Sequence, residues 1–340
     1  MGNFVSQTQL HTPNQDDALT DAYARRLTYL RLSITDVCNF RCDYCLPNGY
    51  DKKRPTDELS VDEIATLVRG FAELGTKKVR LTGGEPSLRR DLPAIIDTVA
   101  NTNGIDKVCI STNGYRLGKQ VQDWLEAGLS QINTSIDSFD PDVFAQITGH
   151  DILPKLLGDI DDVLADGRAV IKINAILKAQ HANATLSQAL DYVRHRPVSF
   201  RFIEFMQTTD NSDLFFREHI RSQTLIDQLL DMGWQALPRR HTDGPAITYT
   251  HSDYAGTIGI IAPYAPTFCE SCNRVRVNAQ GKLHMCLFDS VNFDLREALQ
   301  TNDTTALKQQ LHTLIPAKPE HHFLHDDDSG LMHNLSLVGG

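Results

Sequence analysis

The chain has 340 residues, of which 41% are hydrophobic and 22% charged, a composition typical of a globular protein with one large domain plus an elaboration. It contains no apolar run of the roughly 18 residues that a membrane span needs, and its first residues lack a secretory signal pattern. The net charge of −10 argues against nonspecific nucleic-acid binding but does not exclude an anionic small ligand. We therefore expect a cytoplasmic protein without membrane or nucleic-acid partners.

Short segments rich in β-forming residues alternate with amphipathic helical segments through the first 206 residues. The best defined helix covers about residues 61–74, because Ser60 and Glu63 form a capping box and Gly75 follows the last turn. Further helices are expected near residues 118–127 and 153–165. The six strands are expected at residues 28–35, 77–83, 106–112, 131–137, 170–177 and 199–206.

Six consecutive β-α repeats predict an α/β fold with a parallel sheet and helices outside it, either open or rolled into a full or partial barrel. Ligands of such folds bind at the carboxyl ends of the strands, where the distinctive residues of this chain also lie. From residue 207 the pattern changes to a helix near 225–232 and short alternating stretches, which indicates a smaller C-terminal domain. The predicted organisation is a flexible leader (1–26), a β-α domain (27–206) and a C-terminal domain (207–340).

Seven cysteines form two triplets and one single residue, Cys109. An odd number without a secretory signal argues against a disulfide framework and for metal sites in a reducing compartment. The first triplet follows the first strand as Cys38, Cys42 and Cys45. Three thiolates within eight residues can hold a four-iron cluster with one iron open to another ligand. A zinc site is the alternative, although zinc sites generally have four ligands and C-x2-C pairs.

The second triplet comprises Cys269, Cys272 and Cys286. Here a zinc site is a stronger alternative, because His284 could complete a set of three cysteines and one histidine. Since His284 alternates with Cys286 on a predicted strand, both would face one metal only if the backbone bends there.

Several Arg and Lys residues lie on predicted strands, at positions that we do not expect to face solvent. Arg274 and Arg276 alternate on a predicted strand, so both guanidinium groups point the same way, and paired arginines suit triphosphate oxygens. Arg31, Arg80 and Lys172 lie inside apolar strands, where a charge needs a partner or a cleft. Together they predict a basic pocket.

The ordered set of motifs resembles the GTP 3′,8-cyclase family of radical S-adenosylmethionine (SAM) enzymes over residues 27–340. The set comprises RLSITDVCNFRCDYC, VRLTGGEPSLR, STNGYRL, NTSIDS, KINAILK, FRFIEFM, FCESCNRVRVNAQGKLHMCLF and the terminal Gly-Gly. The resemblance implies an incomplete (β/α)6 radical SAM barrel with a smaller C-terminal domain carrying a second cluster. It also implies cyclisation of GTP to (8S)-3′,8-cyclo-7,8-dihydroguanosine 5′-triphosphate, the first step of molybdenum cofactor biosynthesis.

The same resemblance implies two [4Fe-4S] clusters and a set of site residues. Cys38, Cys42 and Cys45 would hold the cluster that binds SAM, and Cys269, Cys272 and Cys286 the cluster next to the substrate. SAM would contact Tyr44, Gly84, Ser135 and Met206. GTP would contact Arg31, Arg80, Ser111, Lys172, Arg274, Val275 and Arg276, although the family generally has Thr at the position of Ser111. The terminal Gly339 and Gly340 would act inside the active site.

The implied partners are GTP, an external electron donor, a downstream cyclic pyranopterin monophosphate synthase and a second copy of the chain in a homodimer. Two other functions are compatible with the cysteines. One is a radical SAM enzyme that modifies a peptide and carries an auxiliary cluster, although such enzymes tend to have more C-terminal cysteines. The other is a non-catalytic iron–sulfur or zinc protein.

Overall fold

A computed structural model describes residues 18–51, 57–239, 243–288, 291–322 and 324. Its strands form one curved sheet in the order β12-β11-β10-β1-β2-β3-β4-β5-β6-β9-β8-β7. The six central strands are β1 (Tyr29–Thr35), β2 (Lys78–Gly83), β3 (Lys107–Thr112), β4 (Gln131–Ser135), β5 (Val170–Leu177) and β6 (Ser199–Glu204). Each pairs in parallel with the next, and each lies within two residues of its predicted bounds. The predicted α/β fold with a parallel sheet is confirmed, and the curved sheet agrees with the incomplete barrel that the resemblance implies.

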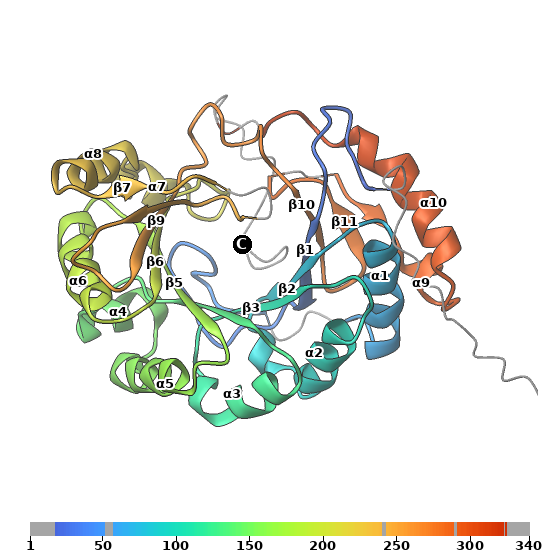
Figure 1. Cartoon of the computed structure of the whole chain (residues 1–340), viewed down its shortest axis with the longest axis horizontal. Coiled ribbons are helices and arrows are strands. Elements are labelled where there is room, and N and C mark those ends of the chain that lie inside the picture. Colours follow the sequence, from blue (N-terminus) through green and yellow to red (C-terminus); the bar gives the residue numbers. More distant parts are fainter. Residues whose placement is uncertain (1–17, 52–56, 240–242, 289–290, 323, 325–340) are drawn as a thin grey trace, which may run out of the picture.

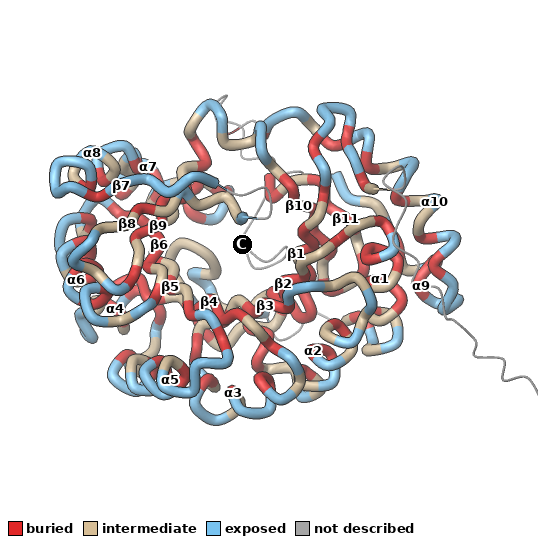
Figure 2. The backbone as a smooth tube through the Cα atoms, viewed as in Figure 1, coloured by how far each residue is buried: buried red, intermediate tan, exposed pale blue. Residues whose placement is uncertain are grey.

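Helices line the outer side of the curved sheet (Figure 1). They are α1 (Val61–Glu73), α2 (Leu92–Ala100), α3 (Leu117–Glu126), α4 (Pro141–Thr148), α5 (Leu153–Asp166) and α6 (Ala182–Arg194). Helix α1 begins at the predicted capping box, in which Ser60 Oγ accepts from the Glu63 N–H and Glu63 Oε2 accepts from the Ser60 N–H. Figure 2 shows buried strands inside and helices with exposed outer faces. The spacing of apolar residues in each helix therefore predicts which face of the helix packs on the sheet.

The chain beyond residue 207 extends both edges of this same sheet. After the short helices α7 (Ser212–Glu218) and α8 (Gln223–Asp231), β9 (Thr257–Ile261) pairs in parallel with β6. Strand β10 (Arg274–Val277) pairs in parallel with β1 at the opposite edge. A six-stranded partial barrel leaves two edges with unpaired backbone groups, and the C-terminal segment covers both. The remaining elements are β7 (Gln235–Ala236), β8 (Ile247–Thr250), β11 (Lys282–His284), β12 (Phe293–Asp294), α9 (Arg296–Leu299) and α10 (Thr304–Leu314), with 3-10 turns at Pro86–Leu88 and Ile315–Ala317.

Residues 18–26 differ from the flexible leader expected at residues 1–26. Leu19 is buried in the core, and its backbone N–H donates to the carbonyl of Leu74. Thr20 and Arg26 form a bridge, and Arg25 is buried against Asp21. The sequence suggested a leader because nine residues are too few to show a helical or strand period. Residues 1–17 lie outside the described part, and no described helix has the length and apolarity to cross a membrane.

Candidate active site

The first cysteine triplet lies on the loop that follows β1, at the carboxyl end of the sheet. Cys38, Cys42 and Cys45 line a cavity there. The residues predicted to contact SAM line the same cavity: Tyr44 from the loop, Gly84 from the end of β2, Ser135 from the end of β4 and Met206 after β6. The fold thus brings together seven predicted residues from four segments. All three thiols are free of disulfides.

Two glycines bring the end of β2 against the backbone that leads into the cysteine loop. A Cβ on Gly84 would lie 2.3 Å from the carbonyl oxygen of Val37, and one on Gly83 would lie 2.1 Å from that of Thr35. Gly83 also has a φ of +134°, which disfavours any other residue. The N–H groups of Gly84 and Glu85 donate to the carbonyls of Thr35 and Val37. The glycines are therefore needed to place the loop, as well as to leave room for a ligand.

Glu85 ties this turn to the end of β3. Its carboxylate is fully buried and accepts from Thr112 Oγ1 at 2.7 Å, the Asn113 N–H at 2.6 Å and the Ser87 N–H at 3.0 Å. Burial raises its pKa, while these hydrogen bonds oppose the rise. The GGEP and STNG motifs are thus one hydrogen-bonded unit.

The other side of the cysteine loop is fastened to β4 and β5. Tyr44 donates its hydroxyl to Asp137 Oδ2 at 2.9 Å, and Asp137 Oδ1 accepts from the Ile176 N–H at 2.8 Å. Asp43 forms an ion pair with Lys178 at 2.7 Å. The loop is therefore held from both sides, which pre-organises its three thiols.

Two thiols of the first triplet, Cys38 and Cys42, favour their protonated form. Burial raises the pKa of Cys38 to about 11 and that of Cys42 well above its usual value, with Asp137 adding to the second shift. Iron binding must displace these protons, because the thiolate is the ligand.

The second triplet lines a neighbouring cavity that is strongly basic. Cys269 and Cys272 follow β9, and Cys286 follows β11. Among the described residues that line this cavity there is no carboxylate. Its eight cations are Arg31, Lys78, Arg80, Lys172, Arg201, Arg274, Arg276 and Lys318. Such a cavity suits a polyanion, because uncompensated like charges are costly to gather.

Strand register explains how these cations meet. Arg31 on β1 lies opposite Arg276 on β10 and opposite Arg80 on β2. Three guanidinium groups therefore share one level of the barrel, and Arg274 lies one pleat away from Arg276. Ser111 and Lys172 line the cavity as predicted. Val275 does not, because the residue between two inward-facing arginines points to the other face and packs in the core.

Sequence reasoning missed several lining residues, among them Tyr29, Lys78 and Arg201. Tyr29 and Lys78 lie two residues before Arg31 and Arg80, so strand alternation would have placed them on the same face. Arg201 lies over Gly259, where a Cβ would come within 2.5 Å of its Cγ. Within the described chain, its Nε and Nη2 have no hydrogen-bond partner. Burial, assisted by Arg80, lowers its pKa to about 9.

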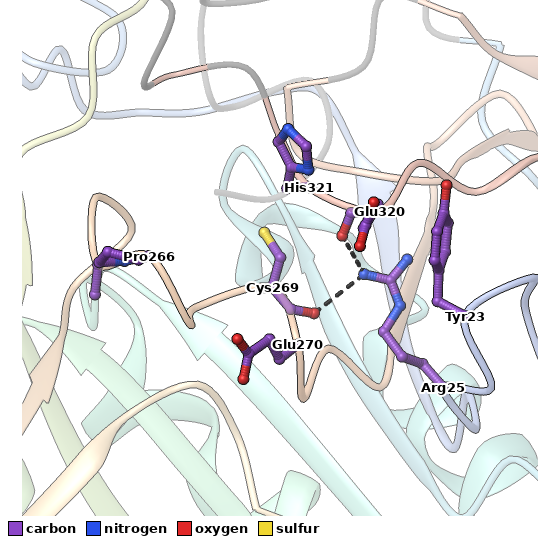
Figure 3. A pocket seen from close by; sticks show the side chains of 8 residues that line it. Tyr23, Arg25, Pro266, Cys269, Glu270, Glu320 and His321 are labelled. Atoms are coloured by element: carbon purple, nitrogen blue, oxygen red, sulfur yellow. Dashed lines mark hydrogen bonds between the residues drawn. The ribbon is translucent and has the colours of Figure 1, made fainter.

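Cys272 differs from the thiols of the first triplet. Burial acts to raise its pKa, but the cations Arg274, Lys318 and Arg25 outweigh burial and lower it to about 6. Lys318 also donates to the carbonyl of Met285, next to Cys286. Figure 3 shows Arg25 donating to the carbonyl oxygens of Cys269 at 3.1 Å and Glu320 at 2.6 Å.

The zinc alternative for the second triplet is not assembled. His284 is buried opposite Arg276 and does not line the cavity, whereas Cys286 does. In the part of the chain that the structure describes, no three His, Cys, Asp or Glu side chains are gathered closely enough for one metal ion.

The two cavities share Ser111, Ser135, Asn174, Ile203 and Met206 in their walls. A ligand in one cavity would therefore lie next to a ligand in the other. The predicted residues Gly339 and Gly340 lie outside the described residues.

Comparisons with known proteins agree with this geometry. Residues 32–157 match the model of the Radical SAM superfamily, and residues 198–324 match that of Molybdenum Cofactor Synthesis C. A Haemophilus influenzae protein named GTP 3′,8-cyclase is 46% identical over 96% of this chain and 97% of its own length. One from Actinobacillus succinogenes with the same name is 48% identical over 96% of this chain and 98% of its own.

Among solved structures, Streptococcus suis SuiB bound to S-adenosylmethionine superposes with a TM-score of 0.59 at 13% identity, over 84% of this chain and 68% of SuiB. At that identity the likeness shows the fold alone. The curated relatives, which match almost end to end, show more. The chain belongs to the GTP 3′,8-cyclase family of radical SAM enzymes.

Proposed function

We propose that this protein catalyses the radical SAM cyclisation of GTP to (8S)-3′,8-cyclo-7,8-dihydroguanosine 5′-triphosphate, the first step of molybdenum cofactor biosynthesis. One observation carries the proposal: a cavity with three cysteines opens beside a second cysteine-lined cavity that has eight cations and no carboxylate among its described lining. Relatives named GTP 3′,8-cyclase at 46% and 48% identity support it.

In the first cavity, Cys38, Cys42 and Cys45 would hold a [4Fe-4S] cluster and leave one iron open to SAM. When bound, the cluster and SAM would supply the radical chemistry that takes the ribose 3′ hydrogen of GTP. The protein's own part is to orient and shield the reactants. Tyr44, Gly84, Ser135 and Met206 form the walls against which SAM would lie.

In the second cavity, Cys269, Cys272 and Cys286 would hold the second [4Fe-4S] cluster next to the substrate. Arg31, Arg80, Arg274 and Arg276 would bind the triphosphate through charge-assisted hydrogen bonds, which the planar guanidinium group makes in pairs. Ser111 lies in the wall that the two cavities share, and Lys172 lines the basic cavity, so both would contact the nucleotide beside its triphosphate. Arg201 offers two further donor nitrogens, Nε and Nη2, in the same cavity.

The chemistry implies partners as well. Cleavage of SAM needs one electron, and the cyclised nucleotide, which has lost a hydrogen atom, needs a second electron and a proton, so the external donor supplies two electrons for each product. The cyclised nucleotide also needs an enzyme that converts it to cyclic pyranopterin monophosphate. A homodimer and a cytoplasmic location belong to the same proposal.

An anaerobic reconstitution followed by assay tests this proposal. The expected iron content is about eight per chain, four for each cluster. With GTP, SAM and a strong reductant, we expect 5′-deoxyadenosine and a cyclised nucleotide in equal amounts. Zinc alone in the purified protein, or 5′-deoxyadenosine that forms only with a peptide present, would overturn it in favour of the binding or peptide-modifying alternative.

A further inference from the structure

The basic cavity contains one acidic side chain that is not a cysteine. Among its described lining residues, eight carry a positive charge, none is Asp or Glu, and Tyr29 alone can become an anion apart from the three thiols. Gathering eight cations in a largely buried cavity is unfavourable without compensating negative charge. A bound triphosphate would supply that charge, and without it the Cys272 thiolate alone offsets only a small part of the positive charge.

Tyr29 is placed to supply further negative charge. The side chain lies on β1 and is 4% exposed, and its hydroxyl oxygen accepts from Arg80 Nε at 2.5 Å. Lys78 Nζ lies 4.5 Å from the centre of its ring. Arg31 follows on the same face of β1, and Arg274 is the register partner of Tyr29 on β10.

We propose that Tyr29 is the exchangeable counter-ion of this cavity: above neutral pH its phenol is ionised when the cavity holds no polyanion, and it takes up one proton from solvent when a triphosphate binds. The inference rests on the proposed function, because it assumes that the polyanion is the triphosphate of GTP. It adds a positioning residue whose charge changes with each binding event.

The surrounding groups give the direction of the effect. Burial favours the neutral phenol, but Arg80, Lys78 and Arg31 outweigh it and lower the pKa of Tyr29 to about 7. Cys109 on β3 opposes them. From β10, Arg276 also faces the phenol. A triphosphate brings about four negative charges to these same cations, which would raise the pKa of Tyr29 and drive proton uptake.

The pH dependence follows by linkage. Below pH 7 the phenol already carries its proton, so binding takes up none from this group. Above pH 7 the proton must be taken from solvent, and GTP binding weakens by up to about tenfold per pH unit relative to a protein without the phenol. The matched variant is Tyr29→Phe, which keeps the ring that packs against Lys78 and removes only the hydroxyl.

Isothermal titration calorimetry of the anaerobically reconstituted enzyme measures this proton uptake directly. GTP is titrated at pH 6 and pH 8 into the wild type and Tyr29→Phe, each in two buffers of different ionisation enthalpy, which reports protons taken up per GTP bound. The difference between wild type and variant removes the contribution of the nucleotide's own phosphate. We expect a difference close to one proton at pH 8 and close to zero at pH 6, with equal iron content in both proteins.

Equal proton uptake by the two proteins at pH 8, with GTP bound by both, would overturn the counter-ion role and leave the proposed function intact. A titration with inorganic tripolyphosphate tests the counter-ion role of Tyr29 independently of the assignment of GTP as the ligand. If it gives the same difference while GTP does not bind, the counter-ion role stands and the assignment of the nucleotide fails. Binding of neither anion would overturn both.

Discussion

The two cysteine triplets lie in opposite electrostatic surroundings. The first is buried beside carboxylates, and the pKa of both Cys38 and Cys42 is raised. The second lies among guanidinium and ammonium groups, which lower the pKa of Cys272 to about 6, although burial raises the pKa of Cys269. The described lining of the first cavity has one carboxylate, Asp137, and no Lys or Arg, which suits the cationic sulfonium of SAM, whereas a cation-rich site suits a triphosphate. The fold thus sets a different electrostatic field around each triplet, which would let the same thiol chemistry serve two ligands.

We expect the largest effects from replacing one cysteine of either triplet, because each change should remove the function of one site and leave the other. Cys42→Ala should abolish SAM cleavage, because the first cluster loses a ligand. Cys272→Ala should keep the first cluster, with iron falling from about eight to about four, but should stop GTP turnover. The measurements are iron content, 5′-deoxyadenosine and cyclised nucleotide. Full cyclase activity in Cys272→Ala would reduce the second site to a structural role.

The chain terminus provides a second large effect. Two glycines have no Cβ, so a terminal Gly-Gly can enter a crowded cavity that other residues cannot. Deleting Gly339 and Gly340 should leave folding and iron content unchanged and greatly reduce cyclised product. Wild-type turnover by the truncated enzyme would remove these residues from the active site.

Arg25 tests how the second cysteine loop is supported. Its guanidinium donates to the carbonyls of Cys269, Pro319 and Glu320 and pairs with the fully buried carboxylate of Asp21 at 2.6 Å. Arg25→Ala should destabilise the protein by about 3–5 kcal/mol, because Asp21 is left buried without its partner. The midpoint temperature of thermal unfolding and the iron content should both fall, and the loss of iron should be confined to the second site.

The matched control for that change is Arg26→Ala, which removes an exposed cation next to Arg25 in the chain. Loss of second-site iron in this control as well would show that the segment, and not the guanidinium of Arg25, supports the cysteine loop.

Much of this site could be predicted from the sequence, because its residues belong to strands. Arg31 and Arg80 are single cations inside apolar runs, and their strand positions alone place them in the barrel. Lys318 and His322 also line the basic cavity, but they come from a segment without any period, so no local pattern indicates where they lie. The packing of Leu19 could not be predicted either, because its partner, Leu74, is distant in the sequence.

We expect the smallest of these effects from replacing single arginines of the basic cavity, which tests whether this cavity binds GTP and not SAM. Removing one guanidinium from the basic cavity should cost about 2–4 kcal/mol, since a phosphate oxygen loses a charged donor. Arg80→Ala and Arg276→Ala should therefore lower kcat/KM for GTP by roughly 30- to 1,000-fold, as each 1.4 kcal/mol is tenfold. SAM affinity should change little. Lys107→Ala is the control, since this exposed cation of β3 does not line the cavity.

The division of labour between the two cavities can be measured by binding alone. One variant replaces Cys38, Cys42 and Cys45 by alanine, a second replaces Cys269, Cys272 and Cys286, and the affinities for SAM and GTP are measured anaerobically after reconstitution. We predict that the first variant loses SAM binding and keeps its GTP affinity, while the second keeps its SAM affinity and binds GTP more weakly. If both ligands lost affinity with the same triplet, the two cysteine sites would not serve two ligands and the central claim would be contradicted.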